Sequence, residues 1–211
     1  MDTLSVAIIT YNEEKHISKC LDSITAVADE IIIVDSYSND STMDICNKYP
    51  TKIIQNKFSD FSSQRNLAMS LATKSYLLFI DADEVISDEL ATKIAALKKE
   101  GFVKDVYTIN RLTRFCGKWI KHSGWYPDVK VRLFPKKGSY WSGEFVHEEL
   151  VFPANIPVKQ LNGHLLHYSY YSYKDHRERA DIYSTLTALK MYKKGKRASF
   201  FKPFLSGIMR F

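Results

Sequence analysis

A run of five apolar residues, Tyr76 to Ile80, ends abruptly in the acidic sequence Asp81-Ala82-Asp83-Glu84. An unbroken run of this kind is typical of a strand that is buried on both faces. Carboxylates crowded at the end of one strand repel each other unless a positive charge lies between them. Hard divalent cations bind carboxylate oxygens and share their coordination with phosphates. Two interpretations stay open: a cation that holds a phosphorylated ligand, or an acidic turn that caps the next helix.

Helices and strands alternate through the first half of the chain. Apolar runs at Leu4–Thr10, Ile31–Val34 and Lys52–Gln55 predict three more strands. Apolar residues spaced i, i+3, i+4 and i+7 from Ile17 predict an amphipathic helix, and a further helix is expected over Ser62–Leu71. Alternation with short connections predicts an α/β fold, in which helices cover both faces of a parallel sheet.

Polar residues follow the carboxyl ends of three of these strands, at Thr10 to Glu13, at Asp35 and at Asp81 to Asp83. In open α/β sheets, ligands bind outside the carboxyl ends of the strands. The chain lacks the glycine-rich phosphate loops of dinucleotide-binding and P-loop proteins, so a metal ion and cationic side chains have to meet any phosphate. A nucleotide-sugar fits these requirements, with its nucleoside against the sheet and its diphosphate on a cation.

Four blocks of this sequence resemble family 2 glycosyltransferases, which have the GT-A fold. In the family's order, they are Val6 to Glu13, Ile33 to Thr42, Arg65-Asn66 and Asp81-Ala82-Asp83. Ser36 departs from the second aspartate of the commoner Val-Asp-Asp-Gly-Ser pattern, which weakens any role for that position. The resemblance implies a Rossmann-like, mostly parallel nucleotide-binding sheet with a smaller mixed sheet on the acceptor side.

The resemblance also implies which residues bind the donor. Asp35 would accept a hydrogen bond from the base, Asp81 would contact the ribose or the sugar, and Asp83 would bind a Mg²⁺ or Mn²⁺ ion that bridges the diphosphate. Glu84 is expected to be a bystander. The predicted nucleotide-binding residues are Thr10, Tyr11, Glu13, Asp35, Arg65, Asp81 and Ala82.

A carboxylate base is expected on the acceptor side, because an inverting transfer must remove a proton from the attacking hydroxyl. Asp128, Glu144, Glu148 and Glu149 are candidates. The pattern Trp-x-Gly-x-x-His-Glu, which ends at Glu148, is similar to a family 2 subgroup that includes bacterial lipopolysaccharide core glucosyltransferases. We therefore predict Glu148 as the base, with Asp128 next. A structural ion pair of Glu148 with Arg132 or a lysine is the alternative.

Three other features of the second half have open interpretations. By the resemblance, His167 would complete the metal shell or touch the diphosphate, whereas a lone histidine is more often structural. Arg177 and Arg179 could grip phosphate or be solvated. The aromatic segment from Phe115 to Tyr126 could stack on sugars, but packing as a flap over the sheet is favoured.

One domain is the expectation for 211 residues that are 45% apolar and 26% charged. We predict a glycosyltransferase domain over 1–181, with a nucleotide half of about 1–100 and an acceptor half of about 101–171, and a C-terminal helix and tail over 182–211. No run of about 18 apolar residues suggests a membrane span, and no signal peptide is visible. Three scattered cysteines suit a reducing cytoplasm.

Positive charge is concentrated at the C-terminal end. Residues 182–211 contain seven basic residues and no acidic one; since the whole chain carries +6, residues 1–181 carry −1. Basic residues interleaved with phenylalanines are typical of an interfacial membrane segment, although packing against the catalytic domain is an alternative. We predict that residues 190–211 bind an anionic membrane surface on the inner face of the cytoplasmic membrane, and that nucleic acid is not a partner. The apolar end at Phe211 suggests that the natural chain continues.

These observations predict an inverting, metal-dependent glycosyltransferase that moves a hexose from a UDP-sugar to a membrane-bound or surface-glycan acceptor. Within the resemblance, the most specific prediction is transfer of glucose from UDP-glucose to a lipopolysaccharide inner core. Two alternatives stay open. One is a transferase that acts on a peptide or protein, and the other is a nucleotidyltransferase, which also uses paired acids on an α/β sheet and would release pyrophosphate.

Overall fold

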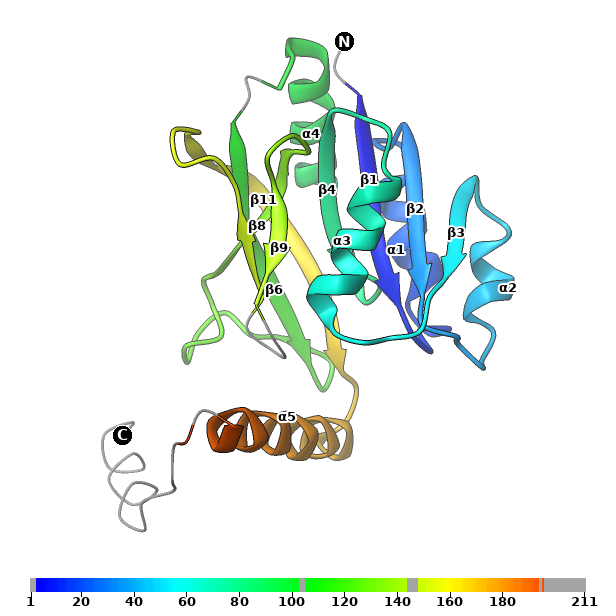
Figure 1. The fold of residues 1–211 in the computed structure, drawn as a ribbon, viewed down its shortest axis with the longest axis vertical. Helices are drawn as coiled ribbons and strands as arrows, with labels where there is room; N and C mark the ends of the chain where they lie inside the picture. The colour runs from blue at the N-terminus through cyan, green and yellow to red at the C-terminus, as the bar shows by residue number, and fades with distance from the viewer. Residues whose placement is uncertain (1–2, 103–104, 144–147, 194, 196–211) are drawn as a thin grey trace. The chain divides into compact units, whose positions relative to one another are not determined.

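The computed structural model describes residues 3–102, 105–143, 148–193 and 195. The chain divides after Tyr173 into two compact units, which are described separately below. The first unit is an α/β fold built on one large sheet, shown in Figure 1.

The first four strands of this sheet are parallel, as the alternation of helices and strands predicts. They lie side by side in the order β3-β2-β1-β4, and α1, α2 and α3 connect them. Their carboxyl ends therefore share one edge of the sheet. The strands are β1 (Leu4–Thr10), β2 (Glu30–Asp35), β3 (Thr51–Gln55) and β4 (Tyr76–Asp81), and the helices are α1 (Ile17–Ile24), α2 (Thr42–Cys46) and α3 (Phe61–Leu71).

The second half of the unit continues the same sheet in the order β8-β6-β11-β5. Strand β8 is antiparallel to both β4 and β6, and β11 is parallel to β6. Strands β6 and β11 thus run in the direction of β1, and their carboxyl ends reach the same edge of the sheet. The elements are β5 (Glu84–Ile86), α4 (Asp88–Glu100), β6 (Val106–Phe115), β7 (Lys118–Trp119), β8 (Asp128–Pro135) and β11 (Val158–Tyr170).

A separate two-stranded antiparallel sheet is formed by β9 (Tyr140–Ser142) and β10 (Glu149–Val151). Helix α3 holds it, because the Asn66 amide donates to the Trp141 carbonyl at 2.8 Å and accepts from the Trp141 N–H at 2.8 Å. This small sheet ends next to Glu148, so α3 helps to position that residue.

Helices α1 and α4 cover one face of the large sheet. Val6 and Ile8 of β1 point to this face and pack in one buried cluster with Leu21 of α1 and Leu90 of α4. In β11, Gly163 has a φ of +96°, and a Cβ there would lie 2.6 Å from the Leu90 backbone nitrogen. Only glycine lets β11 approach α4 so closely.

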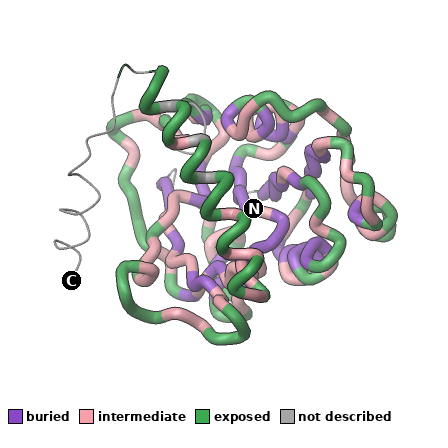
Figure 2. The backbone as a smooth tube through the Cα atoms, turned by 90° about the horizontal axis from the view of Figure 1, so that it is seen from below, coloured by how far each residue is buried: buried purple, intermediate pink, exposed green. Residues whose placement is uncertain are grey.

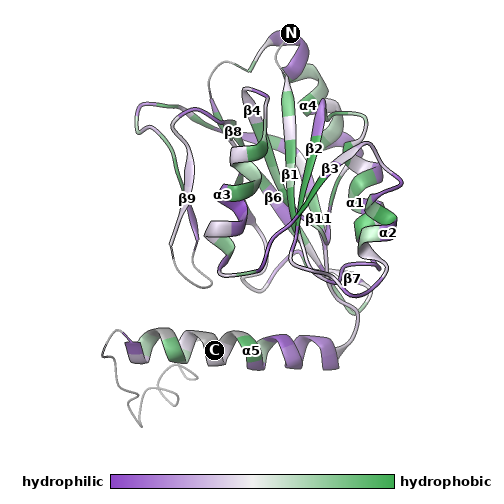
Figure 3. Cartoon of the chain, turned by 45° about the vertical axis from the view of Figure 1, so that its right-hand side comes forward, coloured by the Kyte–Doolittle hydropathy of each residue, from purple (hydrophilic) through white to green (hydrophobic). Residues whose placement is uncertain are grey.

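Helix α3 and the small sheet cover the opposite face. Ala7 of β1 and Phe79 of β4 point this way and pack with Ala68 of α3 and with Trp141 of β9. Because side chains alternate along a strand, neighbouring residues of β1 serve the two different cores. Burial on both faces explains the unbroken apolar strands, which Figure 3 colours as hydrophobic, and Figure 2 shows the buried parts of the backbone in purple.

The second unit, which begins at Lys174, contains α5 (Tyr173–Lys193) except for its first residue. Tyr173, Ile182, Leu189 and Tyr192 are exposed on this helix. Among the described residues, no helix has the length and apolar character that a membrane crossing requires. Of the segment predicted to bind a membrane surface, 190–211, residues 194 and 196–211 lie outside the described residues.

Candidate active site

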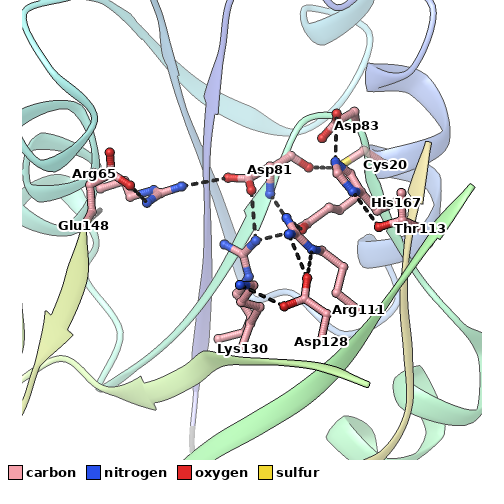
Figure 4. A network of polar contacts seen from close by, with 12 residues as sticks. Cys20, Arg65, Asp81, Asp83, Arg111, Thr113, Asp128, Lys130, Glu148 and His167 are labelled. Carbon is pink, nitrogen blue, oxygen red and sulfur yellow. Dashed lines mark hydrogen bonds and ion pairs between the residues drawn. The ribbon is translucent and has the colours of Figure 1, made fainter. Parts of the chain in front are cut away.

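Asp81, at the end of β4, is held between two arginines (Figure 4). Arg65 of α3 donates from Nη2 to its Oδ1 at 3.2 Å, and Arg132 of β8 donates from Nη2 to its Oδ2 at 2.9 Å. Burial raises the pKa of Asp81, but the charges of Arg132 and Arg65 outweigh burial and hold that pKa well below its usual value. Asp81 is therefore an ionised carboxylate of fixed orientation.

Glu84 lies beneath this cluster and contacts Arg132, Arg111 and the Asp81 backbone, whereas its expected role as a bystander in ligand binding stays a prediction. Its side chain is fully buried, and its Oε1 accepts from Arg132 at 2.7 Å and lies 3.6 Å from Arg111 Nη1. Its Oε2 accepts from the Asp81 backbone N–H at 2.9 Å. Burial raises the pKa of Glu84, and the charge of Asp81 adds to that rise, although Arg132 opposes it. Glu84 thus fixes both the start of the acidic turn and the two arginines below it.

Asp128 lies at the other end of the same network. Its Oδ2 accepts from Arg111 Nε at 2.8 Å and contacts Nη2 at 2.7 Å, and its Oδ1 lies 2.8 Å from Lys130 Nζ. Burial raises the pKa of Asp128, but the hydrogen bond to Lys130 and the charge of Arg111 lower it by more. The pKa of Asp128 is therefore below its usual value. A carboxylate with both oxygens on cations is a weak base, which disfavours this candidate.

Glu148, the favoured candidate base, lies at the opposite end of the network. Its Oε2 accepts from Arg65 Nη1 at 3.4 Å, so Arg65 is an ionic partner of Glu148. Arg65 lies over the Trp141 ring, with its Cζ 4.6 Å from the ring centroid. The Asp60 side chain caps α3 by accepting from the Ser63 N–H, which fixes the turn that carries Arg65. Arg65 therefore joins the Asp81 corner to Glu148.

Asp83 and His167 form a second polar pair beside Asp81. His167 Nε2 lies 3.2 Å from Asp83 Oδ2, and its Nδ1 lies 3.2 Å from Thr113 Oγ1. Burial lowers the pKa of His167, but the charge of Asp83 and the bond to it outweigh burial and raise that pKa. Within the described part of the chain, no group of three His, Cys, Asp or Glu side chains could enclose a metal ion. The pair fits an ion that takes its other ligands from phosphate and water.

The residues predicted to bind the nucleoside gather at the ends of β1 and β2. Asp35 is fully buried, and its Oδ2 accepts from the Ser38 N–H at 3.0 Å and from Gln55 Nε2 at 3.1 Å. Thr10 is buried, whereas Tyr11 is 56% exposed. The structure thus places Tyr11 at the surface of the predicted pocket and Asp35 beneath its loop.

Two loops at this edge are tied together by side-chain bonds to the backbone. The Asn12 N–H donates to Ser38 Oγ at 2.9 Å, and the Asn39 N–H donates to Asn12 Oδ1 at 2.9 Å. Tyr37 has a φ of +62°, which is uncommon for a bulky side chain. The exposed rings of Tyr11 and Tyr37 stand on these two loops.

Glu13 and Ala82 complete the predicted nucleotide set. Glu13 Oε2 lies 2.6 Å from His16 Nδ1, and His16 Nε2 lies 2.8 Å from the Tyr171 hydroxyl. Ala82 is buried between the two aspartates of the acidic turn. Glu13 therefore supports the end of β1 through a buried histidine that the sequence analysis did not select.

Sequence reasoning did not assign Arg111 or Arg132 to the site. A signal for Arg132 exists, since it lies between Val131 and Leu133 in an apolar strand, and a charge in such a place requires a partner. The aromatic segment packs as a flap, with the Phe115 ring edge-on to Trp125 at 5.8 Å and to Tyr170 at 5.9 Å. Arg177 and Arg179 lie on α5, in the second unit, which is not placed relative to this site.

Comparison with known proteins identifies the family. The family model described as "Glycosyl transferase family 2" matches residues 5–148. An uncharacterized glycosyltransferase of Rickettsia typhi is 30% identical over 214 residues, which cover 96% of this chain and 72% of the relative. LpsC of Rhizobium meliloti, a lipopolysaccharide core biosynthesis glycosyltransferase, is 28% identical, over 94% of this chain and 75% of its own length.

A solved structure shows the same fold. Residues 1–349 of TarS from S. aureus align with a TM-score of 0.53 and 20% identity, over 87% of this chain and 65% of that one. This likeness confirms the predicted α/β fold of the GT-A type. The match of the family model to more than half of the chain, together with the Rickettsia relative, shows that this chain belongs to glycosyl transferase family 2 and is a glycosyltransferase.

Proposed function

We propose that this enzyme transfers a hexose, with inversion and with the help of a divalent metal ion, from a UDP-sugar to a lipopolysaccharide inner core or another surface glycan. Glucose from UDP-glucose is the specific donor that we propose. The similarity to LpsC, whose name refers to lipopolysaccharide core biosynthesis, supports this class of acceptor.

The observation that carries the proposal is the Arg65 bridge. One guanidinium contacts Asp81, in the acidic turn, at 3.2 Å and Glu148, the candidate base, at 3.4 Å. The proposed donor corner and the proposed base are therefore held in a fixed relation by a side chain that is 12% exposed. A donor sugar at Asp81 and an acceptor hydroxyl at Glu148 would lie on adjacent sides of Arg65.

The proposed roles follow from these positions. Asp83 and His167 would hold the metal ion, which when bound would supply positive charge to the departing diphosphate. Asp81, held by its two arginines, would orient the ribose or the sugar. Glu148 would accept the proton of the acceptor hydroxyl as that oxygen attacks the sugar carbon, and Arg65 would keep the Glu148 carboxylate aimed at the hydroxyl.

At the nucleoside end, Thr10, Tyr11, Glu13 and Asp35 would form the pocket. The exposed Tyr11 ring would meet the nucleoside directly. Asp35 is already bonded to Ser38 and Gln55, so it would act on the base together with these neighbours.

A panel of nucleotide-sugars tests the proposal. The purified protein is incubated with UDP-glucose, other UDP-sugars and GDP-mannose, with Mn²⁺ or with EDTA, and the release of UDP or pyrophosphate is measured. The proposal expects UDP from UDP-glucose only with metal, faster when an inner-core saccharide is added, and a β-anomeric product by NMR. Pyrophosphate release would indicate a nucleotidyltransferase, and a preference for a peptide would move the acceptor to protein.

We also propose that the C-terminal region binds anionic membranes. The support is its charge, since residues 182–211 carry seven basic residues and no acidic one. Removal of residues 196–211 should lower co-sedimentation of the protein with vesicles of phosphatidylglycerol, and co-sedimentation with neutral vesicles should not change. Unchanged sedimentation would favour a tail that packs on the catalytic domain.

A further inference from the structure

Two cations lie over one tyrosine ring next to the Asp83–His167 pair. Lys19 Nζ of α1 is 5.4 Å from the centroid of the Tyr168 ring, and Arg114 Cζ of β6 is 5.8 Å from the same centroid. Arg114 Cζ also lies 5.7 Å from the Trp119 ring centroid, and the two rings contact each other edge-on at 5.4 Å. Both cations therefore lie within 5.8 Å of the centroid of one ring, that of Tyr168.

Among the described residues, neither cation has a negative partner. Lys19 and Arg114 form no ion pair with any carboxylate there, and the Arg114 Nε–H donates to the Gly117 carbonyl at 3.2 Å. Arg65, Arg111 and Arg132, by contrast, are each paired with acids at the same edge of the sheet. An anion that reaches either charge meets no carboxylate already paired with it among the described residues, so the anion would be stabilised there.

The backbone of β11 is shaped to present this ring. The pairing of β11 with β6 shifts its register twice, once between Gln160 and His164 and again between His167 and Tyr170. In this irregular stretch, the Tyr168 N–H donates to the Asp83 carbonyl at 2.9 Å. A bulge that re-aims a side chain is a feature of strand ends next to active sites. Tyr168 therefore links the two cations, which contact its ring, to Asp83, which accepts from its backbone N–H.

We propose that Lys19 and Arg114 form a phosphate-binding site on the Tyr168 and Trp119 rings. Cation–π contacts hold each charge in place without neutralising it, so the side chains are already oriented when a phosphoryl group arrives. Arginine can donate two parallel bonds to a phosphate, and lysine adds a point charge. The inference rests on the proposed function in taking a phosphorylated substrate as the ligand. That phosphate is either the diphosphate of the donor or a phosphoryl group on the acceptor.

Calorimetric titration of single variants tests this site. Lys19→Gln and Arg114→Gln are compared with the wild type and with Lys52→Gln, which removes an exposed charge from β3, distant in the strand order. The probes are UDP, uridine, inorganic pyrophosphate and glucose 6-phosphate, each with Mg²⁺ and with EDTA. If the donor supplies the phosphate, each variant should bind UDP and pyrophosphate about tenfold more weakly, the effect of one lost charge-assisted bond. The affinity for uridine should not change, and Lys52→Gln should bind every probe like the wild type.

The other outcomes separate the two sources. Weaker binding of glucose 6-phosphate alone, with UDP unchanged, would support the site and assign its phosphate to the acceptor. Unchanged binding of all phosphates in both variants, an equal loss in Lys52→Gln, or a wild type that binds no phosphate would overturn the inference. Arg114→Lys, which keeps the charge, should retain most of the affinity. If the Arg114→Gln variant unfolds at a lower temperature than the wild type, the titration of Lys19→Gln decides, because Lys19 is exposed and its replacement should not disturb the fold.

The test also stands apart from the proposed function. A protein that releases no UDP from any UDP-sugar, but whose pyrophosphate binding depends on Lys19, would refute the proposed transfer and keep the phosphate site. If both variants turn over UDP-glucose at the wild-type rate and bind every phosphate with unchanged affinity, the proposed transfer stands and the phosphate site is refuted.

Discussion

Replacing Arg65 with methionine should destabilise the protein and uncouple Glu148 from the donor corner. Methionine keeps much of the length over the Trp141 ring but removes the charge. Asp81 would still be held by Arg132 at 2.9 Å, so most of the cost falls on Glu148, which is 11% exposed and loses its Arg65 contact. Breaking a buried ion pair costs about 3–5 kcal/mol, and loss of a cation–π contact adds about 0.5–2 kcal/mol. Because Asp81 keeps Arg132, the main loss is that of one buried pair, and methionine keeps part of the contact with the Trp141 ring, so we expect a total of about 3–5 kcal/mol.

Urea unfolding followed by circular dichroism measures this loss, and a double-mutant cycle with Glu148→Gln isolates the pair. A direct Arg65–Glu148 interaction predicts a coupling free energy of about 0.5–3 kcal/mol, whereas independent sites add to within about 0.3–0.5 kcal/mol. Arg65→Lys serves as the matched control, because it keeps the charge but loses the fork that reaches both carboxylates. Additive free energies in the cycle would refute the bridge, and with it the argument that carries the proposed function.

Four further outcomes are expected. Asp83→Ala should abolish the Mn²⁺-dependent part of UDP binding in calorimetry, and unchanged heat would remove it from the metal site. Glu148→Gln should keep its affinity for UDP-glucose and lose about 10²-fold or more in transfer rate, and full activity would return the role of base to Asp128. The pKa of Asp128 is lowered, so its contribution to stability is present above about pH 4 and is lost as the pH falls through the folded-state pKa. In the Asp128→Asn variant, the urea concentration at the unfolding midpoint should therefore change less between about pH 7 and about pH 3 than in the wild type. Cys116 is exposed and should be the one thiol that reacts with Ellman's reagent at pH 8, because burial raises the pKa of the two buried cysteines.

The parallel half of the fold could be predicted because its signals are local. The run Tyr76–Ile80 is apolar throughout since both faces of β4 are covered, and the Ile17 spacing marks the one face of α1 that is buried. The end of each strand is visible as a change from apolar to polar residues. Once the strands are known to be parallel, the rule that their carboxyl ends share an edge brings Thr10, Asp35 and Asp81 together.

The charge network could not be predicted in the same way, because its partners come from separate strands. Arg132 reaches Asp81 and Glu84 only because β8 inserts antiparallel between β4 and β6, and no local pattern shows that insertion. Glu84 reads from sequence as a third acid in a turn. In the structure it pairs with Arg132 and Arg111, which come from two distant strands, so no local pattern of the sequence shows these contacts.

The alternation of charges in this network explains how an acidic strand end can accept a polyanion. From Glu148 the contacts run through Arg65, Asp81, Arg132, Glu84 and Arg111 to Asp128 and Lys130, so four acids are matched by four cations. A diphosphate brought to this edge therefore meets little net repulsion from Asp81 and Glu84, since each is already neutralised by a cation beneath it. The acid left outside the chain of contacts is Asp83, which faces His167. A cation bound there, with Lys19 and Arg114 nearby, would place the positive charge of the site where the phosphates have to lie.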